Sequence, residues 1–373
     1  MRSTSLDTPT LEITLTMTRR STRMLHAFAA PLLFSALGLS SALGCRPPAT
    51  AEAAAALETT APLAGDLAAA IAQAEREAAG HLGVGILHVE SGERASFHGA
   101  ERFPMQSVFK LPLAIDVFAR VDAGEIRLDE VLPVRPIDIR PGPPHSLAEE
   151  IPATGGERTV LDLLERALIT SDNTATDVLL ERIGGPRKVT ERLAGLGITG
   201  IDVSRSEADL MMDFVGVTAK PPRDTLTLAR LLESCRVPDA VRTRALATYL
   251  ADPRDTATPT ATADLLLRVH RQDLLRKASS ARLVSILERV TTGKDRLKAL
   301  LPAGTVVAHK TGGSDVTDGV VAATNDVGII TLPGAAGHVI VAAFLKEARG
   351  DDAARAHALA LVGRAVFDHY ASR

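Results

Sequence analysis

The pattern of apolar and polar positions predicts strands near both ends of the chain and helices between them. Around a Ser-Gly-Glu turn near the N-terminus, and in three runs near the C-terminus, apolar and β-branched residues are enriched as in strands. The predicted strands are 84–89, 95–97, 305–309, 327–331 and 339–345. The predicted helices are 66–80, 159–168, 175–183, 187–196 and 351–370. This order predicts an α/β (α+β sandwich-like) fold, in which an antiparallel sheet built from both termini is flanked by helices and carries an inserted all-helical domain.

The first 45 residues have the features of an export signal rather than of a folded domain. Arg19, Arg20 and Arg23 precede an apolar stretch that ends in small residues before Cys45, a pattern typical of a signal peptide and too short for a spanning helix. Cleavage before Cys45 would leave a cysteine to which a lipid anchor can be attached; ordinary signal cleavage is the alternative. The pair Arg19-Arg20 is also compatible with a twin-arginine export signal. We expect an exported, periplasmic protein, anchored or free, with 46–65 as a flexible tether.

Composition narrows the function classes. A formal net charge of −3, with basic residues scattered along the chain, gives no reason to expect a nucleic-acid partner. After loss of the signal peptide Cys235 is the one cysteine left in the body of the domain, so an intrachain disulfide is not expected there. The ten histidines show no helical or hairpin metal spacing. We therefore expect a monomer that needs neither metal nor cofactor.

Ser107 and Lys110 are the first candidates for chemistry. They lie three residues apart after Pro104, near the predicted start of a helix, so their side chains can point the same way and share a hydrogen bond. A lysine amine beside a serine hydroxyl can activate that hydroxyl as a nucleophile. A Ser-x-x-Lys match alone is weak evidence, because an exposed helical serine and lysine would give the same pattern.

Two further short motifs follow in the chain. The segment 171–173, Ser-Asp-Asn, joins two predicted helices and can present a hydroxyl and an amide to a cleft, although by itself it reads better as an N-cap turn. The segment 309–313, His-Lys-Thr-Gly-Gly, lies at the end of a predicted strand. There Lys310 and Thr311 can bind a carboxylate, and Gly313 lets a backbone N–H approach a carbonyl oxygen.

Ser-x-x-Lys, Ser-Asp-Asn and Lys-Thr-Gly, in this order, resemble the motif set of class A β-lactamases and penicillin-binding proteins. The resemblance covers about residues 66–373, which we interpret as one catalytic domain. It implies an α/β part at about 66–106 and 293–373, and an all-helical part at about 107–292.

Glu207 favours the class A β-lactamase branch of this resemblance. It lies 36 residues after Ser171, the spacing at which class A enzymes place the glutamate of their Ω-loop, and penicillin-binding proteins lack this carboxylate. The run 252–259 resembles the end of the same loop. We therefore expect Arg205 and Asp255 to pair across the neck of the loop.

Three departures from the family pattern qualify the resemblance. Met211 stands where the family usually has an asparagine that helps to hold a water molecule. The stretch between Glu207 and Asp255 is about 35 residues longer than the family loop, and its extra part, about 214–250, is predicted to form a helical insertion of two helices. The segment 314–324 is also longer than usual.

The chemistry implied by the resemblance is hydrolysis of a β-lactam amide through an acyl-enzyme on Ser107. The proton of Ser107 would pass to Lys110, or to Glu207 through a water, and which base acts is disputed for the family. Ser171 would pass a proton to the departing lactam nitrogen. Glu207 would then activate the water that cleaves the ester.

The substrate contacts implied by the resemblance surround the same centre. Lys310, Thr311 and Arg296 would bind the substrate carboxylate, although a surface helix charge is the alternative interpretation of Arg296. Asn173 would hold the side-chain amide of the substrate. Gly313 would contribute a backbone N–H to the oxyanion hole, together with that of the nucleophile.

Two other functions remain open at this stage. One is a penicillin-binding or D-Ala-D-Ala peptidase-like serine hydrolase, and the other is a catalytically idle lipoprotein that uses the fold as a binding module.

Overall fold

The structure is a computed structural model, and it describes residues 61–63, 65–152 and 154–372. The predicted signal peptide, Cys45 and most of the predicted tether therefore lie outside the described residues. The end of that tether does not: the two-residue strand β1 (Ala61–Pro62) pairs in parallel with β3 (Arg94–Phe97), so the sheet begins earlier than expected. Within the described residues, no helix combines the length and apolar character that crossing a bilayer requires.

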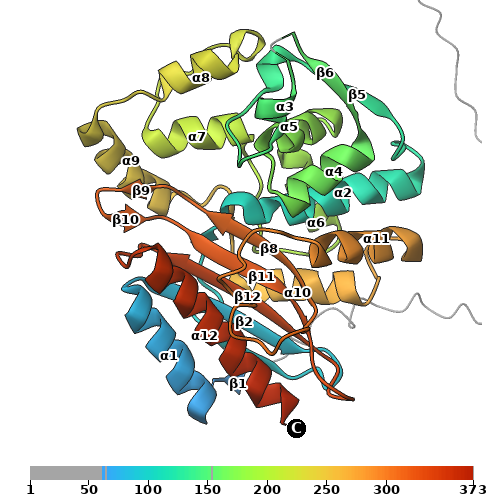
Figure 1. Cartoon of the computed structure of the whole chain (residues 1–373), viewed down its shortest axis with the longest axis vertical. Coiled ribbons are helices and arrows are strands. Elements are labelled where there is room, and N and C mark those ends of the chain that lie inside the picture. Colours follow the sequence, from blue (N-terminus) through green and yellow to red (C-terminus); the bar gives the residue numbers. More distant parts are fainter. Residues whose placement is uncertain (1–60, 64, 153, 373) are drawn as a thin grey trace, which may run out of the picture. The chain divides into compact units, whose positions relative to one another are not determined.

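A six-stranded sheet in the described part of the chain joins the two ends of the sequence, as the pattern predicted (Figure 1). Its order is β1-β3-β2-β12-β11-β8, and every pair except β1–β3 is antiparallel. The remaining strands are β2 (His81–His88), β8 (Val307–Gly313), β11 (Thr324–Thr331) and β12 (His338–Lys346). The predicted strand 305–309 was misplaced, because β8 begins at Val307 and continues through the Lys-Thr-Gly motif to Gly313.

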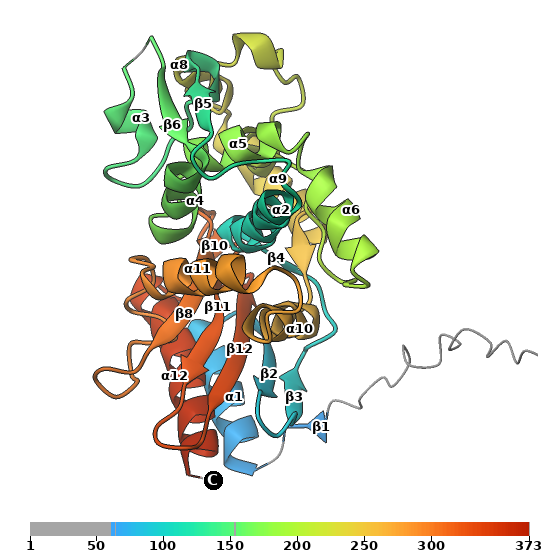
Figure 2. The ribbon, with the colours of Figure 1, turned by 90° about the vertical axis from the view of Figure 1, so that its right-hand side faces the viewer.

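Helices cover both faces of the sheet. On one face α12 (Asp352–Ala371) packs on β11 and β12, and α1 (Gly65–Ala78) packs beside it. On the other face α10 (Pro259–His270) crosses β2 and β12, while α11 (Lys277–Glu288) packs on β8. Figure 2 shows α10 and α11 between the sheet and the helices of the middle of the chain, such as α2 and α4. Apolar burial on both faces of the central strands fixes these layers.

The middle of the chain forms a second group of helices around α2. They are α2 (Lys110–Ala123), α3 (Leu147–Glu150), α4 (Val160–Ile169), α5 (Asn173–Arg182) and α6 (Arg187–Gly195). The central helix α2 is buried over most of its length, which makes it the core of this group. The segment 107–292 is not all-helical as predicted, because β5 (Val131–Val134) and β6 (Gly156–Thr159) form a small antiparallel pair. Another short pair joins β4 (Phe103–Pro104) to β7 (Thr256–Ala257).

The long segment between Glu207 and Asp255 folds into three helices and a short 3₁₀ turn. The helices are α7 (Glu207–Val215), α8 (Leu228–Ser234) and α9 (Asp239–Ala251), and the turn is η4 (Arg223–Thr225). Apolar side chains of these helices share a small core of their own. The two helices expected within the extra part of the loop are thus α8 and α9, and they pack against α7 instead of standing apart.

The neck of this segment is tied by a buried ion pair. Arg205 Nε donates to Asp255 Oδ2 at 2.5 Å, and Asp255 Oδ1 accepts the backbone N–H groups of Ser204 and Arg205. The Arg205 guanidinium also reaches Asp213 at 3.2 Å and Asp252 at 3.3 Å. The predicted pairing of Arg205 with Asp255 is confirmed. Two segments 50 residues apart are therefore held together by one guanidinium whose side chain is 4% exposed.

We expect Asp255→Asn to destabilise the fold by about 1.5–3 kcal/mol, because it removes the negative charge from a buried hydrogen bond to a guanidinium. Asparagine tolerates the left-handed backbone at this position, where φ is +54°. Urea unfolding measures the effect. Asp368→Asn, in an exposed pair with Arg364, is the matched control and should not change stability measurably. Equal stability of both variants and the parent would show that the neck does not depend on this pair.

Candidate active site

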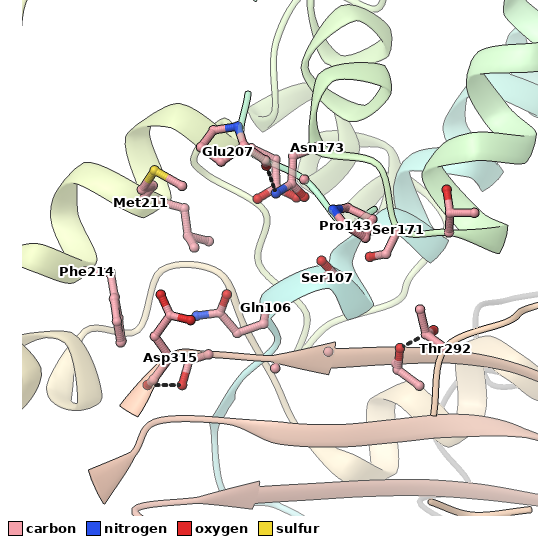
Figure 3. Close-up of a pocket in the computed structure, with 18 of the residues that line it drawn as sticks. Gln106, Ser107, Pro143, Ser171, Asn173, Glu207, Met211, Phe214, Thr292 and Asp315 are labelled. Carbon is pink, nitrogen blue, oxygen red and sulfur yellow. Dashed lines mark hydrogen bonds between the residues drawn. The ribbon is translucent and has the colours of Figure 1, made fainter. Parts of the chain in front are cut away.

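An open pocket of about 440 Å³ lies where the β8 edge of the sheet meets the helical group around α2 and the start of the helical segment that begins with α7. Figure 3 shows Ser107 near its middle, with Met211 and Phe214 on one side and Ser171 and Thr292 on the other. The predicted residues that line it are Ser107, Ser171, Asn173, Glu207, Arg296, Thr311 and Gly313. Lys110 and Lys310 are fully buried behind this lining. The structure therefore brings together all nine predicted site residues.

Ser107 sits in a short 3₁₀ helix, η2 (Gln106–Phe109), which runs directly into α2. The edge strand β8 approaches this turn so closely that a Cβ on Gly312 would come within 2.4 Å of the Met105 carbonyl oxygen. From the next strand, Asn325 donates from Nδ2 to the carbonyls of Pro104 at 2.8 Å and Met105 at 3.0 Å. The backbone leading to Ser107 is thus fixed against the sheet.

The Lys110 ammonium is the centre of the polar network. Its Nζ donates to Asn173 Oδ1 at 2.6 Å and to the Ser171 carbonyl at 2.8 Å, and lies 2.9 Å from Glu207 Oε1. The expected hydrogen bond between Lys110 and Ser107 is absent from the contacts of the described residues. The reason is that oxygens of Ser171, Asn173 and Glu207 occupy the three donors of the ammonium.

Ser171 lies between two ammonium groups. Its Oγ accepts from Lys310 Nζ at 3.1 Å and from Lys110 Nζ at 3.3 Å. Its backbone is left-handed, with φ +65°, directly before the N-cap of α5, and this conformation directs it between the two lysines. Burial, and then the charge of Lys110, hold the pKa of the Lys310 ammonium well below its usual range.

Glu207 begins α7, and its carboxylate turns back toward Lys110. Ser206 caps the helix by accepting the N–H of Asp209. Burial raises the pKa of the Glu207 carboxyl, Lys110 opposes the rise, and the charge of Asp177 adds to it. A buried carboxylate with a raised pKa, in contact with one ammonium, is suited to accept a proton.

Asp177 and Arg140 are positioning residues that the sequence motifs did not reveal. Asp177 Oδ1 accepts the backbone N–H of Glu207 at 2.7 Å, and its Oδ2 accepts from Arg140 Nε at 2.7 Å. Both side chains are less than 5% exposed. Asp177 is one helical turn after Asn173, so helical spacing from the Ser-Asp-Asn motif was the one available signal.

The other end of the pocket is suited to bind an anion. Thr311 Oγ1 lies 2.6 Å from Thr292 Oγ1, and both face the pocket beside Gly313 at its rim. Arg296 lines the pocket as expected, and its Nη1 donates to the carbonyls of Gly312 at 2.9 Å and Asn325 at 2.8 Å. These two hydrogen bonds fix the guanidinium of Arg296, and its other N–H groups can still donate to an anion.

Asn173 is more constrained than the motif suggested. Its Oδ1 accepts from Lys110, and its Nδ2 donates to the Pro141 carbonyl at 2.7 Å. Both ends of the amide are thus oriented, and one N–H of Nδ2 can still face the pocket.

The α7 side of the pocket is apolar apart from Glu207. Leu210, Met211 and Phe214 are the other α7 residues that line it. Met211 lies four residues after Glu207 and so on the same face of the helix. The thioether of Met211 cannot donate a hydrogen bond, so α7 offers a water molecule only the carboxylate.

Two clusters of metal-ligating side chains occur among the described residues, and neither lies in this pocket. Glu75, His81 and His98 form one, and Glu90, His270 and His338 form the other. The sequence did not suggest them, because their spacings along the chain match neither helical nor hairpin metal motifs.

Comparison with known proteins gives a consistent result. The model of a family described as "Beta-lactamase enzyme family" matches residues 66–370. A β-lactamase from Pseudomonas aeruginosa, VEB-1, is 28% identical over 78% of this chain and 86% of its own length. The extended-spectrum β-lactamase PER-1 from the same organism is 32% identical over 71% of this chain and 75% of its own length.

Solved structures agree with this match. The crystal structure of the TLA-3 extended-spectrum β-lactamase superposes with a TM-score of 0.68 at 28% identity, covering 82% of this chain and 98% of that one. An ancestral class A β-lactamase superposes with a TM-score of 0.64 at 34% identity, covering 81% of this chain and 99% of that one.

Proposed function

This chain belongs to the β-lactamase enzyme family, in its class A, and we propose that it hydrolyses the β-lactam amide through an acyl-enzyme on Ser107. The observation that carries the proposal is the contact of one buried ammonium, Lys110, with the Glu207 carboxylate and with Ser171, beside the exposed face of Ser107. A binding module without catalysis would have no need of a carboxylate and an ammonium buried together, which are costly to desolvate.

In acylation, the Ser107 oxygen attacks the lactam carbonyl carbon and its proton leaves to a base. The donors of Lys110 are directed at Ser171, Asn173 and Glu207, which supports the route through Glu207 and a water. The carbonyl oxygen becomes an oxyanion that the backbone N–H groups of Ser107 and Gly313 stabilise.

Collapse of the tetrahedral intermediate breaks the carbon–nitrogen bond of the ring. The leaving nitrogen takes a proton from Ser171, and the neighbouring ammonium of Lys110 returns one to that hydroxyl. Lys110 then takes up the proton that Glu207 accepted from Ser107, which restores the ammonium and the carboxylate before deacylation. The substrate carboxylate binds at Lys310, Thr311 and Arg296. The opened ring is then held as an ester of Ser107.

Deacylation distinguishes this function from that of a penicillin-binding protein. Glu207 takes a proton from water, the hydroxide adds to the ester carbon, and the Ser107 oxygen leaves as the proton returns to it. Since Leu210, Met211 and Phe214 offer this water no hydrogen-bond donor, the step depends on Glu207 and the polar groups facing it across the pocket.

We also propose that the protein is exported, with residues 1–45 as its signal peptide and Cys45 as its lipid-anchor site. The described domain needs no disulfide, since Cys235 is buried as a free thiol, and it is proposed to act in the periplasm as a monomer.

We expect Glu207→Ala to lose far more of its deacylation rate than of its acylation rate, because Lys110, no longer in contact with the carboxylate, can replace Glu207 as the base for the Ser107 hydroxyl, whereas no other base activates the deacylating water. Intact-protein mass spectrometry after mixing with a penicillin should show the added mass of the drug as a persistent species. Glu288→Ala, an exposed carboxylate at the end of α11, is the matched control and should show no such species. Turnover of a chromogenic cephalosporin by Glu207→Ala at the parent rate would exclude the role of Glu207.

The pH dependence of kcat/KM should be bell-shaped, with both limbs moved toward neutrality. The acid limb lies above that of an exposed glutamate, because burial raises the pKa of Glu207 and only its ionised form is a base. The alkaline limb lies below that of an exposed lysine, because the pKa of Lys310 is lowered and only its charged form binds a carboxylate. In Lys310→Arg the alkaline limb should move up, since a guanidinium stays protonated. An alkaline limb unchanged in that variant would contradict the assignment.

A further inference from the structure

The two segments that are longer than in the family pack against each other beside the pocket. Val320 and Ala322, from the segment 314–324, join the same apolar cluster as Leu246 and Tyr249 of α9. This segment contains the short hairpin of β9 (Val316–Thr317) and β10 (Val320–Val321), and α9 contacts β9. The two enlargements therefore form one structural unit rather than two independent surface excursions.

This unit makes a direct polar contact with the nucleophile segment. Gln106 Nε2 donates to the Tyr249 hydroxyl oxygen at 2.8 Å, and the two side chains come from positions 143 residues apart. Both residues are buried, Gln106 at 8% exposure and Tyr249 at 4%. Gln106 immediately precedes Ser107 and lines the pocket.

The backbone conformation of Gln106 explains what this contact stabilises. Its φ of +47° is in the left-handed region, which costs an ordinary side chain of order 1 kcal/mol or more and persists only when surrounding contacts hold it. Asn325 holds the carbonyls of Pro104 and Met105, which lie two residues and one residue before Gln106. Among the described residues, Tyr249 is the hydrogen-bond partner of the Gln106 side chain.

The Tyr249 ring is itself fixed on two sides. Phe214, which lines the pocket, packs edge-on against it with ring centroids 5.1 Å apart and an interplanar angle of 90°. The Arg205 guanidinium lies over the same ring, 5.5 Å from its centroid. The buried neck of the loop therefore orients Tyr249, and Tyr249 orients Gln106.

We propose that Tyr249 is a positioning residue for acylation, through which the helical insertion holds the turn that carries Ser107. The inference rests on the proposed function, because it assigns to the insertion a role in the first chemical step at Ser107. The hydroxyl of Tyr249 fixes the Gln106 side chain, and this fixes the left-handed turn that aims the Ser107 oxygen and its backbone N–H at the substrate carbonyl. Small displacements of a nucleophile and an oxyanion donor are costly in rate.

Tyr249→Phe removes only the hydroxyl and keeps the ring between Phe214 and Arg205. Losing one neutral hydrogen bond should lower the acylation efficiency, measured by stopped flow with a chromogenic cephalosporin, by about five- to tenfold. Gln106→Met, which removes the amide at similar length, should cause a similar decrease. The deacylation rate constant, followed by the decay of the acyl-enzyme mass, should fall less than acylation in either variant, because the Ser107 oxygen is then held by its ester bond and only the oxyanion donor is displaced.

The double variant decides whether the two side chains act together. If Tyr249 acts through Gln106, the combined variant should be no slower than the slower single variant, which is strong non-additivity for a contacting pair. Tyr370→Phe is the matched control: it is the other tyrosine of the chain, 2% exposed and located in α12, and acylation should be unaffected.

Three results would overturn the inference: unchanged acylation in Tyr249→Phe, multiplicative losses in the double variant, or equal losses of acylation and deacylation with a lowered melting temperature. The last result would identify a purely structural tyrosine. If the parent protein forms no acyl-enzyme at all, the proposed function fails and the inference fails with it. If the parent forms an acyl-enzyme and the Tyr249→Phe variant forms it equally fast, only the inference is refuted.

Discussion

A buried ammonium in contact with a buried carboxylate is the constraint on which the site depends. Lys110 is fully buried, and its Nζ lies 2.9 Å from the Glu207 carboxylate. Neither charge could be removed from water alone, because the desolvation cost of each requires the other and further hydrogen bonds. The carbonyl and hydroxyl of Ser171 and the amide of Asn173 supply those bonds. One lysine thereby connects the start of α2, the 171–173 turn and α7.

The rest of the architecture holds these elements in place from outside the pocket. The Arg140–Asp177 pair anchors the start of α7 from α5, while the Arg205–Asp255 pair closes the neck of the loop that carries Glu207. On the opposite side, Gly312 allows β8 to lie against the nucleophile turn. The two ion pairs are buried polar contacts between segments distant in sequence, and together with the close approach of β8 they hold a site that loops and helix ends build.

Much of the fold and most of the site residues could be predicted from the sequence, because short motifs and local periodicity carry that information. Ser107, Lys110, Ser171 and Lys310 belong to short motifs whose residue types are dictated by the chemistry, and the order of strands and helices follows from local periodicity. Even the Arg205–Asp255 contact could be predicted, because the resemblance to class A β-lactamases placed these residues at the two ends of one loop, and those ends must meet. The hydrogen bond expected between Ser107 and Lys110 was wrong, since spacing along a helix cannot show that oxygens from other elements compete for the ammonium.

The contacts of Tyr249 with Gln106 and of Arg140 with Asp177 could not be predicted in this way. They join elements that only the folded chain brings together, and neither partner belongs to a recognisable motif. The same holds for the packing of the 314–324 hairpin on the insertion, where both segments looked like separate surface additions. Side-chain packing in three dimensions, and not local pattern, turns these additions into one wall of the site.

The central claim is tested most directly by locating the covalent bond to the substrate. The parent protein would be mixed with labelled penicillin, quenched rapidly with acid, digested and mapped by tandem mass spectrometry. The account predicts a single adduct, on the hydroxyl of Ser107. An adduct on another residue, or no adduct while the penicillin is hydrolysed, would contradict it.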